Sequence, residues 1–232
     1  MQLFLQLDLD DLPDPELTAR FGGGGLLQLF YCTGTHRLAR PLDPANFSPG
    51  GVLTGEAAMD MLRMACPAGG GRPFEAGNLT RIVRPSGPAQ PSLAYENEDE
   101  PLPPRLITGW RRVTDLPHAE EHAELGLKID YDFHRRTATV TCEPLGLVFR
   151  DMPEDVSEQL ATALRGDKLA GWPSWVQGVE YPDCPRCGRR MQHVFQLDSN
   201  DHLAFMFGDV GRGHVTQCPS HPDVVAFGWA CS

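Results

Sequence analysis

Cys184-Pro185-Arg186-Cys187-Gly188 is the stretch around which the C-terminal third of the chain is organised. Further along, Cys218-Pro219-Ser220-His221 repeats its spacing and its proline. Two ligands separated by two residues can converge on one metal ion from a tight turn, and a pair of thiolates favours zinc. The two turns therefore predict a structural, zinc-ribbon-like Zn²⁺ site. Its predicted ligands are Cys184, Cys187, Cys218 and His221.

The fourth ligand has a second candidate in Cys231. His221 lies in the same turn as Cys218, whereas Cys231 lies ten residues beyond His221. In a hairpin that turns near residues 220–223, a strand rise of about 3.3 Å per residue places Cys231 more than about 10 Å from Cys218. We therefore predict His221 and keep Cys231 in reserve. The alternative for both motifs is a pair of ordinary turns with buried thiols. His193, His202 and His214 are weaker ligand candidates, better interpreted as polar strand residues.

Composition restricts the class of protein. The chain has 232 residues, of which 41% are hydrophobic and 22% charged, enough for a folded core. No run approaches the roughly 18 apolar residues of a membrane span. The first residues, MQLFLQLDLDD, lack a positive region and reach acidic residues at once, so we expect no signal peptide and a cytoplasmic location. The odd number of cysteines, seven, and the CxxC motif fit a metal site better than a disulfide framework.

The net charge of −11 bears on the partner. Phosphate binding needs a basic field, so nucleic acid is an unlikely partner and a cationic protein a compatible one. An acidic surface also keeps proteins in solution without any further role.

Alternation of apolar and polar residues predicts a β-rich α+β chain with mainly antiparallel sheets. The predicted strands are 1–9, 26–32, 106–113, 125–130, 137–142, 191–197 and 203–207, with a closing hairpin of 214–218 and 224–231. Helices are predicted at 56–66 and 155–165, the second with Val156, Leu160 and Leu164 on its inward stripe. The proline-rich stretch 84–105 is predicted to be a mobile loop or linker.

Two further patterns have a structural and a functional interpretation. His118 and His122 lie four residues apart, but Ala119 occupies the position of the glutamate in HExxH, so a solvated acidic helix is favoured over a metal pair. Trp172 and Trp175 are interpreted as core aromatics or as a lid over the metal site.

The opening sequence recurs late in the chain. Residues 1–8 read MQLFLQLD and residues 191–198 read MQHVFQLD, identical at five of eight positions. Each copy precedes a glycine-rich turn and a strand that ends in cysteine, with His36 near Cys32 and His221 near Cys218. This predicts one domain, 1–232, of two pseudo-repeated lobes, about 1–150 and 151–232. Cys32 and His36 lack a CxxC partner, so no second metal site is predicted.

Several short motifs together resemble the YwqG-like family of bacterial domains. They are GWPxWVQ (171–177), CPxCG (184–188), MxxxxQLD (191–198), GDxG (208–211), CPxHP (218–222) and a terminal FxWxC (227–231). The resemblance implies a β-rich α+β fold of no established activity. Some relatives are encoded beside secreted toxins, which suggests an immunity or toxin-neutralising role. Relatives carry a further N-terminal segment before the first QLD that this sequence lacks, so the chain is either a shortened member of the family or one whose start is trimmed.

Three functions follow as hypotheses. The first is a non-catalytic protein-binding module, such as an immunity protein that occludes a basic toxin. The second is a zinc-dependent, hydrolase-like enzyme in which a loosely held His221 leaves an open position and Asp209 or Asp183 is the base. The third is a nucleic-acid-binding zinc ribbon, favoured by an arginine cluster around the zinc and opposed by the net charge. That cluster is Arg186, Arg189, Arg190 and Arg212.

Overall fold

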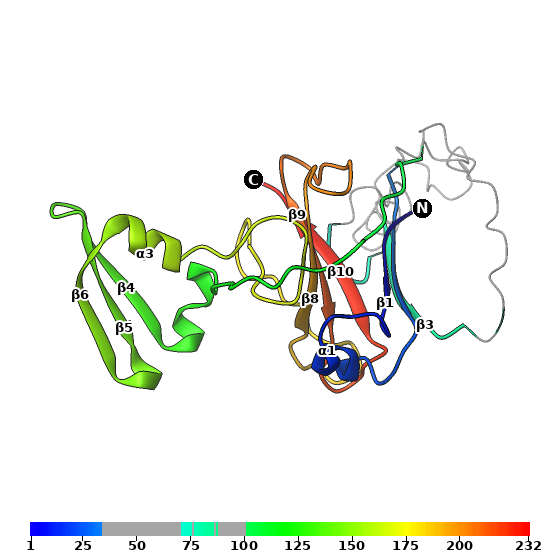
Figure 1. The fold of residues 1–232 in the computed structure, drawn as a ribbon, viewed down its shortest axis with the longest axis horizontal. Coiled ribbons are helices and arrows are strands. Elements are labelled where there is room, and N and C mark those ends of the chain that lie inside the picture. The colour runs from blue at the N-terminus through cyan, green and yellow to red at the C-terminus, as the bar shows by residue number, and fades with distance from the viewer. Residues whose placement is uncertain (34–70, 76, 86, 88–100) are drawn as a thin grey trace, which may run out of the picture. The chain divides into compact units, whose positions relative to one another are not determined.

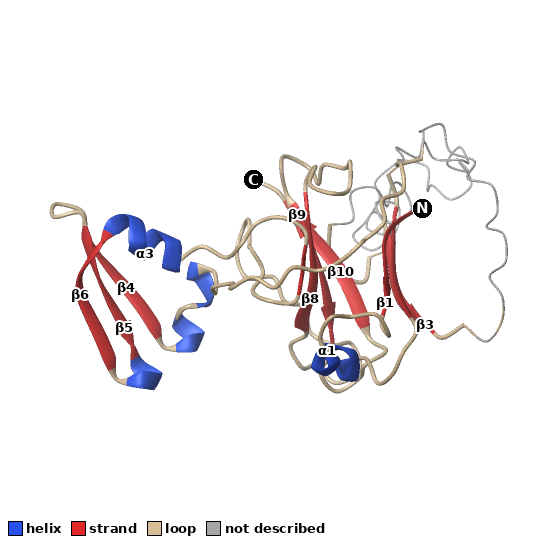
Figure 2. Cartoon of the chain, viewed as in Figure 1, coloured by secondary structure: helices blue, strands red, loops and turns tan. Residues whose placement is uncertain are grey.

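The computed structural model describes residues 1–33, 71–75, 77–85, 87 and 101–232. These residues form three antiparallel sheets with short helices, as expected of a β-rich α+β chain (Figure 1, Figure 2). They divide into two compact units. One comprises Met1–Pro104 and Gln217–Gly228, and the other Arg105–Thr216 and Trp229–Ser232. The two related lobes stay a prediction.

The first unit contains a meander of three strands in the order β1-β2-β3. Strand β1 is Gln2–Asp8, β2 is Leu26–Tyr31 and β3 is Asn78–Val83, each antiparallel to its neighbour. A bulge between Leu3 and Leu5 interrupts the alternation of β1. The core of this unit includes the ring of Tyr31, which packs against Phe4 at 5.0 Å and against Phe227 at 6.0 Å between centroids.

The prolines after β1 begin a helix as well as ending the strand. Helix α1, Pro15–Arg20, starts with Asp14 as its N-cap, whose carboxylate accepts the Glu16 N–H at 2.9 Å. Proline fits the first turn because its missing N–H has no helical partner there. The Asp-Pro pair is the signal that the sequence analysis missed.

The second unit contains a small sheet in the order β4-β5-β6, preceded and followed by short helices. Its strands are β4 (Leu127–Asp132), β5 (Thr137–Cys142) and β6 (Leu147–Pro153). The 3₁₀ turns η3 (Ala119–Glu121) and η4 (Ala123–Leu125) precede β4, η5 (Glu143–Leu145) joins β5 to β6, and helix α3 (Glu154–Leu160) follows.

A further sheet runs in the order β10-β9-β8-β7. Its strands are β7 (Lys168–Leu169), β8 (Gln192–Asp198), β9 (Arg212–Gln217) and β10 (Val225–Ala230). Strand β9 is buried at every position, and β8 at every position but its first. Both central strands nevertheless carry polar side chains, so their buried polar atoms need hydrogen-bond partners.

The predicted helix 155–165 ends early, at Leu160. The backbone beyond it has tertiary partners, because the Leu164 N–H donates to the Asp115 carboxylate at 2.8 Å and the Leu164 carbonyl accepts from the Lys168 ammonium at 2.6 Å. Lys168 in turn pairs with Asp115 at 2.8 Å. The expected inward stripe is therefore wrong at Val156 and Leu164, which are both 40% exposed.

Other predicted elements also differ. Residues 106–113 form no strand, and Leu106 is 86% exposed. Residues 203–207 form a bend and a loop instead of a strand, and their hydrogen bonds are local, as from the Phe205 N–H to the Leu203 carbonyl. The solvated helix at 118–122 is instead a 3₁₀ turn that buries His122, whose ring nitrogen contacts the Pro117 carbonyl at 3.2 Å. The predicted helix 56–66 and most of the proline-rich stretch lie outside the described residues.

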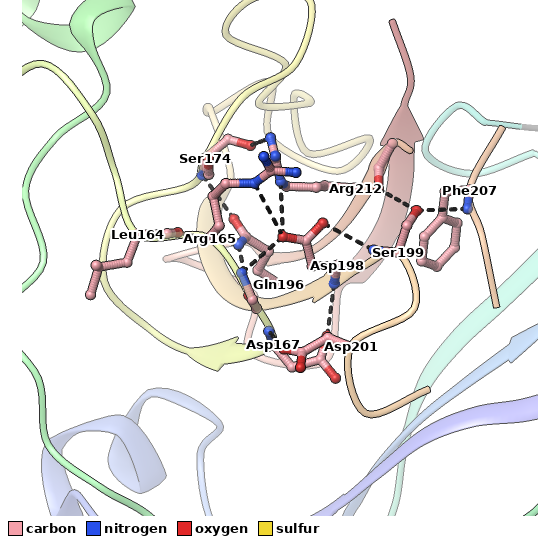
Figure 3. Close-up of polar contacts among 12 residues, drawn as sticks. Leu164, Arg165, Asp167, Ser174, Gln196, Asp198, Ser199, Asp201, Phe207 and Arg212 are labelled. Atoms are coloured by element: carbon pink, nitrogen blue, oxygen red, sulfur yellow. Dashed lines mark hydrogen bonds and ion pairs between the residues drawn. The ribbon is translucent and has the colours of Figure 1, made fainter. Parts of the chain in front are cut away.

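A buried network of polar side chains joins β8, β9 and the segment 164–174 (Figure 3). The Asp198 carboxylate accepts the Gly166 N–H at 2.8 Å and pairs with the Arg212 guanidinium at 3.1 Å. Gln196, fully buried, accepts the Ser174 N–H and donates to the Gly166 carbonyl, each at 2.8 Å. The QLD motif thus supplies side chains that satisfy the backbone of a loop.

We expect Asp198→Ala to destabilise the fold by about 3–5 kcal/mol, because it leaves the buried Arg212 guanidinium without its counter-charge. Asp8 is the matched control from the first copy of the repeat. Its exposed carboxylate accepts only the local Asp10 N–H at 3.0 Å among the bonds described, so Asp8→Ala should cost about 1 kcal/mol or less. Urea unfolding measures both, and equal losses would contradict the role assigned to Asp198.

Candidate metal centre

The first pair of the cluster lies in a tight turn that closes on Cys184. The Cys184 N–H donates to the Arg189 carbonyl at 2.8 Å, and the Gly188 N–H donates to the Cys184 carbonyl at 2.8 Å. This turn buries Cys184 to 2% exposure, whereas Cys187 is exposed. The CPxC spacing therefore presents one inner and one outer thiol.

The second pair lies in the turn between β9 and β10. The Cys218 N–H donates to the Val224 carbonyl at 3.0 Å, and the Val224 N–H donates to the His221 carbonyl at 2.9 Å. The Cys218 sulfur lies 3.5 Å from His221 Nδ1 and accepts the Ser220 N–H at 3.4 Å. The His221 ring therefore turns its Nδ1 atom toward the Cys218 sulfur.

The four ligand atoms of Cys184, Cys187, Cys218 and His221 all lie within 4.8 Å of one another. A tetrahedral zinc site with bonds of about 2.0–2.3 Å places its ligand atoms about 3.5–3.8 Å apart. The Cys218–His221 distance of 3.5 Å already matches. Three sulfurs and one imidazole also form a donor set that suits a soft or borderline divalent ion. The cluster can bind a metal ion, and its residues fit zinc.

The reserve ligand Cys231 is not a member of the Cys₃His cluster. Its side chain instead packs against the GDxG turn. Its carbonyl accepts from the Gln177 side chain. A Cβ added at Gly208 would approach the Cys231 sulfur to 2.5 Å, and one at Gly211 would approach the Ala230 carbonyl to 2.1 Å. The GDxG motif therefore allows the terminal FxWxC segment to pack closely.

The two candidate bases have ordinary surroundings. Asp183 forms an isolated β-bridge with Arg190 beside the CPxC turn. Asp209 is exposed in the GDxG turn, where its carbonyl accepts the Ser232 hydroxyl at 3.1 Å. Both side chains are exposed to solvent.

Two of the four arginines predicted to surround the metal have partners elsewhere. Arg212 is 7% exposed and pairs with Asp198. Arg190 pairs with Glu124 at 2.5 Å and lies 4.3 Å over the ring of Tyr181. Their charges are therefore neutralised within the fold, which weakens the case for an arginine surface that binds phosphates.

A buried polar cluster that sequence reasoning missed lies around Glu121. This carboxylate is 4% exposed and accepts from Trp175 Nε1 at 2.7 Å and from the Tyr181 hydroxyl at 3.2 Å. Burial raises the pKa of the Tyr181 phenol, and the Glu121 charge raises it further. Trp175 is thus a core aromatic, as one of its two interpretations expected. The HAEEH sequence did not predict a buried carboxylate, because the burial of Glu121 depends on residues that are distant in the sequence.

His214 lies next to this cluster, with its ring 4.7 Å from Trp175 and 5.7 Å from His193 between centroids. Its Nδ1 is buried and has no hydrogen-bond partner among the described residues. Burial lowers the pKa of His214 well below its ordinary value, and the nearby positive charges lower it further. The folded chain therefore holds His214 neutral.

A second group, Asp167, Asp201 and His202, also brings possible ligand atoms within 4.8 Å. Its carboxylates already accept backbone donors, since Asp167 binds the Asp198 N–H at 2.7 Å and Asp201 binds the Asp167 N–H at 2.7 Å. Burial raises the pKa of Asp167, and the charge of Asp201 raises it further. These contacts close the turn after β8, as Figure 3 shows for the two aspartates.

Fold and site define a β-rich α+β protein with a Cys₃His cluster that can hold a metal ion. The chain belongs to the family described as "Domain of unknown function (DUF1963)", whose model matches residues 1–219. Neither the curated proteins nor the solved structures that were searched gave a match. Among the described residues, no helix combines the length and the apolar character needed to cross a bilayer.

We expect Cys218→Ser to remove bound metal and to lower the Tm, because a hydroxyl is a poor substitute for a buried thiolate ligand. Cys231→Ser is the matched control and should keep the full metal content. Elemental analysis of the purified variants measures this. If Cys231→Ser also lost its metal, the choice of His221 as the fourth ligand would be contradicted.

We expect stability to fall by up to about 1.4 kcal/mol per pH unit below pH 6.5 on account of His214. In the unfolded chain the His214 imidazole binds a proton in this pH range, whereas in the folded chain it stays neutral, so acid favours unfolding. His214→Gln should reduce the slope between pH 6.5 and 5, above the range in which carboxyl groups titrate. His134→Gln, at an exposed turn, is the control and should retain the wild-type slope. Equal slopes in all three chains would contradict a neutral buried His214.

Proposed function

We propose that this chain is a non-catalytic protein-binding module stabilised by a structural Zn²⁺ ion. The observation that carries the proposal is the Cys184, Cys187, Cys218 and His221 cluster. Four protein ligands complete a tetrahedral shell, which is the arrangement of structural zinc sites, whereas catalytic zinc keeps a position for water or substrate. Two of the thiols are almost fully buried, which favours a role in holding the fold.

The net charge of −11 supports a basic protein as the partner, because opposite charge speeds encounter and selects the partner. The resemblance to the YwqG-like family, if it extends to function, adds a bacterial immunity or toxin-neutralising role in the cytoplasm. In that role the acidic chain occludes a basic toxin. The family itself is described only as a domain of unknown function.

A zinc-dependent hydrolase-like enzyme is the alternative. It requires His221 to leave the metal so that water can bind, with Asp183 or Asp209 as the base. The 3.5 Å contact between His221 Nδ1 and the Cys218 sulfur favours a held histidine instead. Asp183→Ala and Asp209→Ala variants that act as wild type in the cell would exclude this alternative.

We expect purified protein to contain one zinc ion per chain, held until the chain unfolds. A chelator should then lower the Tm by about 10 °C or more, because roughly 2–4 °C correspond to each kcal/mol in a chain of this size and structural zinc contributes several. Elemental analysis and thermal melting with and without chelator measure both. Zinc that exchanges freely with no change in Tm would favour the enzyme.

The binding role is tested by affinity capture from native lysate in low salt. A basic protein that binds at a fixed stoichiometry and is released by salt supports the module. The absence of any stoichiometric protein partner over repeated captures would contradict it.

A further inference from the structure

The β4-β5-β6 sheet has one apolar and one polar face. Residues directly opposite each other in antiparallel strands share a face. The apolar face therefore consists of Leu127, Ile129, Tyr131, Ala138, Val140, Cys142, Leu147, Phe149 and Met152. The polar face consists of Lys128, Asp130, Asp132, Thr137, Thr139, Thr141 and Val148.

Helix α3 packs against this sheet and is much shorter than its strands, as Figure 2 shows. Its seven residues span about 10 Å, whereas the seven of β6 span about 23 Å. The helix packs against β5 and β6, and Ala138 and Val140 on the central strand are buried. Leu147 and Phe149 of β6, on the same face, remain 45% and 47% exposed.

The β4 side of this face is hollowed. A hollow of about 260 Å³ is lined mainly by apolar side chains, with two polar ones, His122 and Lys128. The apolar residues are Leu127, Ile129 and Tyr131 of β4, together with Ala119, Ala123 and Ala161. The register joins it to the exposed residues of β6, because Leu127, Cys142 and Leu147 form one row across the sheet. A second row runs through Ile129, Val140 and Phe149. Large apolar side chains of a partner can therefore lie along the first row and can reach Phe149 at the end of the second row, whose central residue Val140 is buried.

The segment that carries this face is acidic. Residues 119–160 contain ten Asp and Glu but four Lys and Arg. Three of those four cations already pair within the segment: Lys128 with Asp130, Arg135 with Asp132 and Arg136 with Glu154. Exposed carboxylates remain on α3 and η5, at Asp155, Glu158 and Glu143.

We propose that the apolar face of the β4-β5-β6 sheet is a docking surface for a protein segment with large apolar side chains flanked by Lys or Arg. The apolar side chains bury Leu147 and Phe149, and the cations meet the acidic rim. A second copy of this chain is a poorer occupant, because it brings the same acidic rim against itself. The inference rests on the proposed protein-binding function and assigns the surface through which it acts.

The test uses the full-length chain and two fluorescent synthetic peptides. One peptide has a helical stripe of Leu and Phe flanked by Lys, and the other has Glu in place of each Lys. Phe149→Asp alters the apolar face, and Val148→Asp is the matched control on the polar face of the same strand, where Val148 is 51% exposed. Fluorescence anisotropy at low and high salt measures binding.

We expect the Lys peptide to bind the wild type, with an affinity that falls as salt rises. Phe149→Asp should weaken it about tenfold or more, Val148→Asp about twofold or less, and the Glu peptide should bind about tenfold more weakly. Hydrogen exchange of the wild-type chain should slow at 147–149 when the Lys peptide binds. This last measurement remains decisive if the Phe149 variant fails to fold.

No binding of the Lys peptide, equal binding of both peptides, or unchanged exchange at 147–149 would overturn the proposal. A wild-type dimer that Phe149→Asp alone converts to a monomer, seen by sedimentation, would assign the face to a second copy and also overturn it. If the Phe149 variant still captures the basic protein partner from lysate, the binding function stands and this surface fails.

Discussion

The buried ion pair between Asp198 and Arg212 is the constraint on which the second unit depends. Strands β8 and β9 are covered on both faces, so a charge on either must be met inside the fold. Asp198 meets Arg212 at 3.1 Å and also binds the Gly166 N–H, while neighbouring Gln196 binds Ser174. The loop that carries the GWPxW motif is thus fixed to the sheet by side chains as well as by the short ladder between β7 and β8.

The short sequence motifs of the chain are explained by packing more than by chemistry. The two glycines of GDxG allow the C-terminal segment to approach, and Trp175 stacks edge-on against Tyr181 at 4.9 Å while its N–H binds buried Glu121. Among the described residues, the Cys₃His cluster is the group whose donor set suits zinc. A site of this kind, in a family without an assigned activity, is consistent with a role in holding a binding scaffold.

Polar and apolar residues are distributed unusually over two sheets, β10-β9-β8-β7 and β4-β5-β6. The β8 and β9 strands bury Gln196, Asp198 and Arg212, whereas β6 exposes Leu147 and Phe149. Hydrogen bonds compensate for the burial of these polar groups of β8 and β9. Among the described residues, nothing comparable compensates for the exposed apolar area of β6. This contrast is the basis on which we propose the apolar face of the β4-β5-β6 sheet as a docking surface.

Local patterns in the sequence determined the strands and the metal turns. The repeated MQ…QLD motif falls on β1 (Gln2–Asp8) and β8 (Gln192–Asp198) with the same bounds. The CPxC and CPxH spacings predicted the four residues whose ligand atoms the fold brings together. Tertiary contacts decided the rest. Asp115 and Lys168 bind the backbone groups of Leu164 that would have continued α3 past Leu160. Gln6 and Asp8 of β1 are exposed, whereas the equivalent Gln196 and Asp198 of β8 are buried. Spacing along the chain encodes local geometry, whereas burial and competition for hydrogen bonds depend on residues that only the fold brings together.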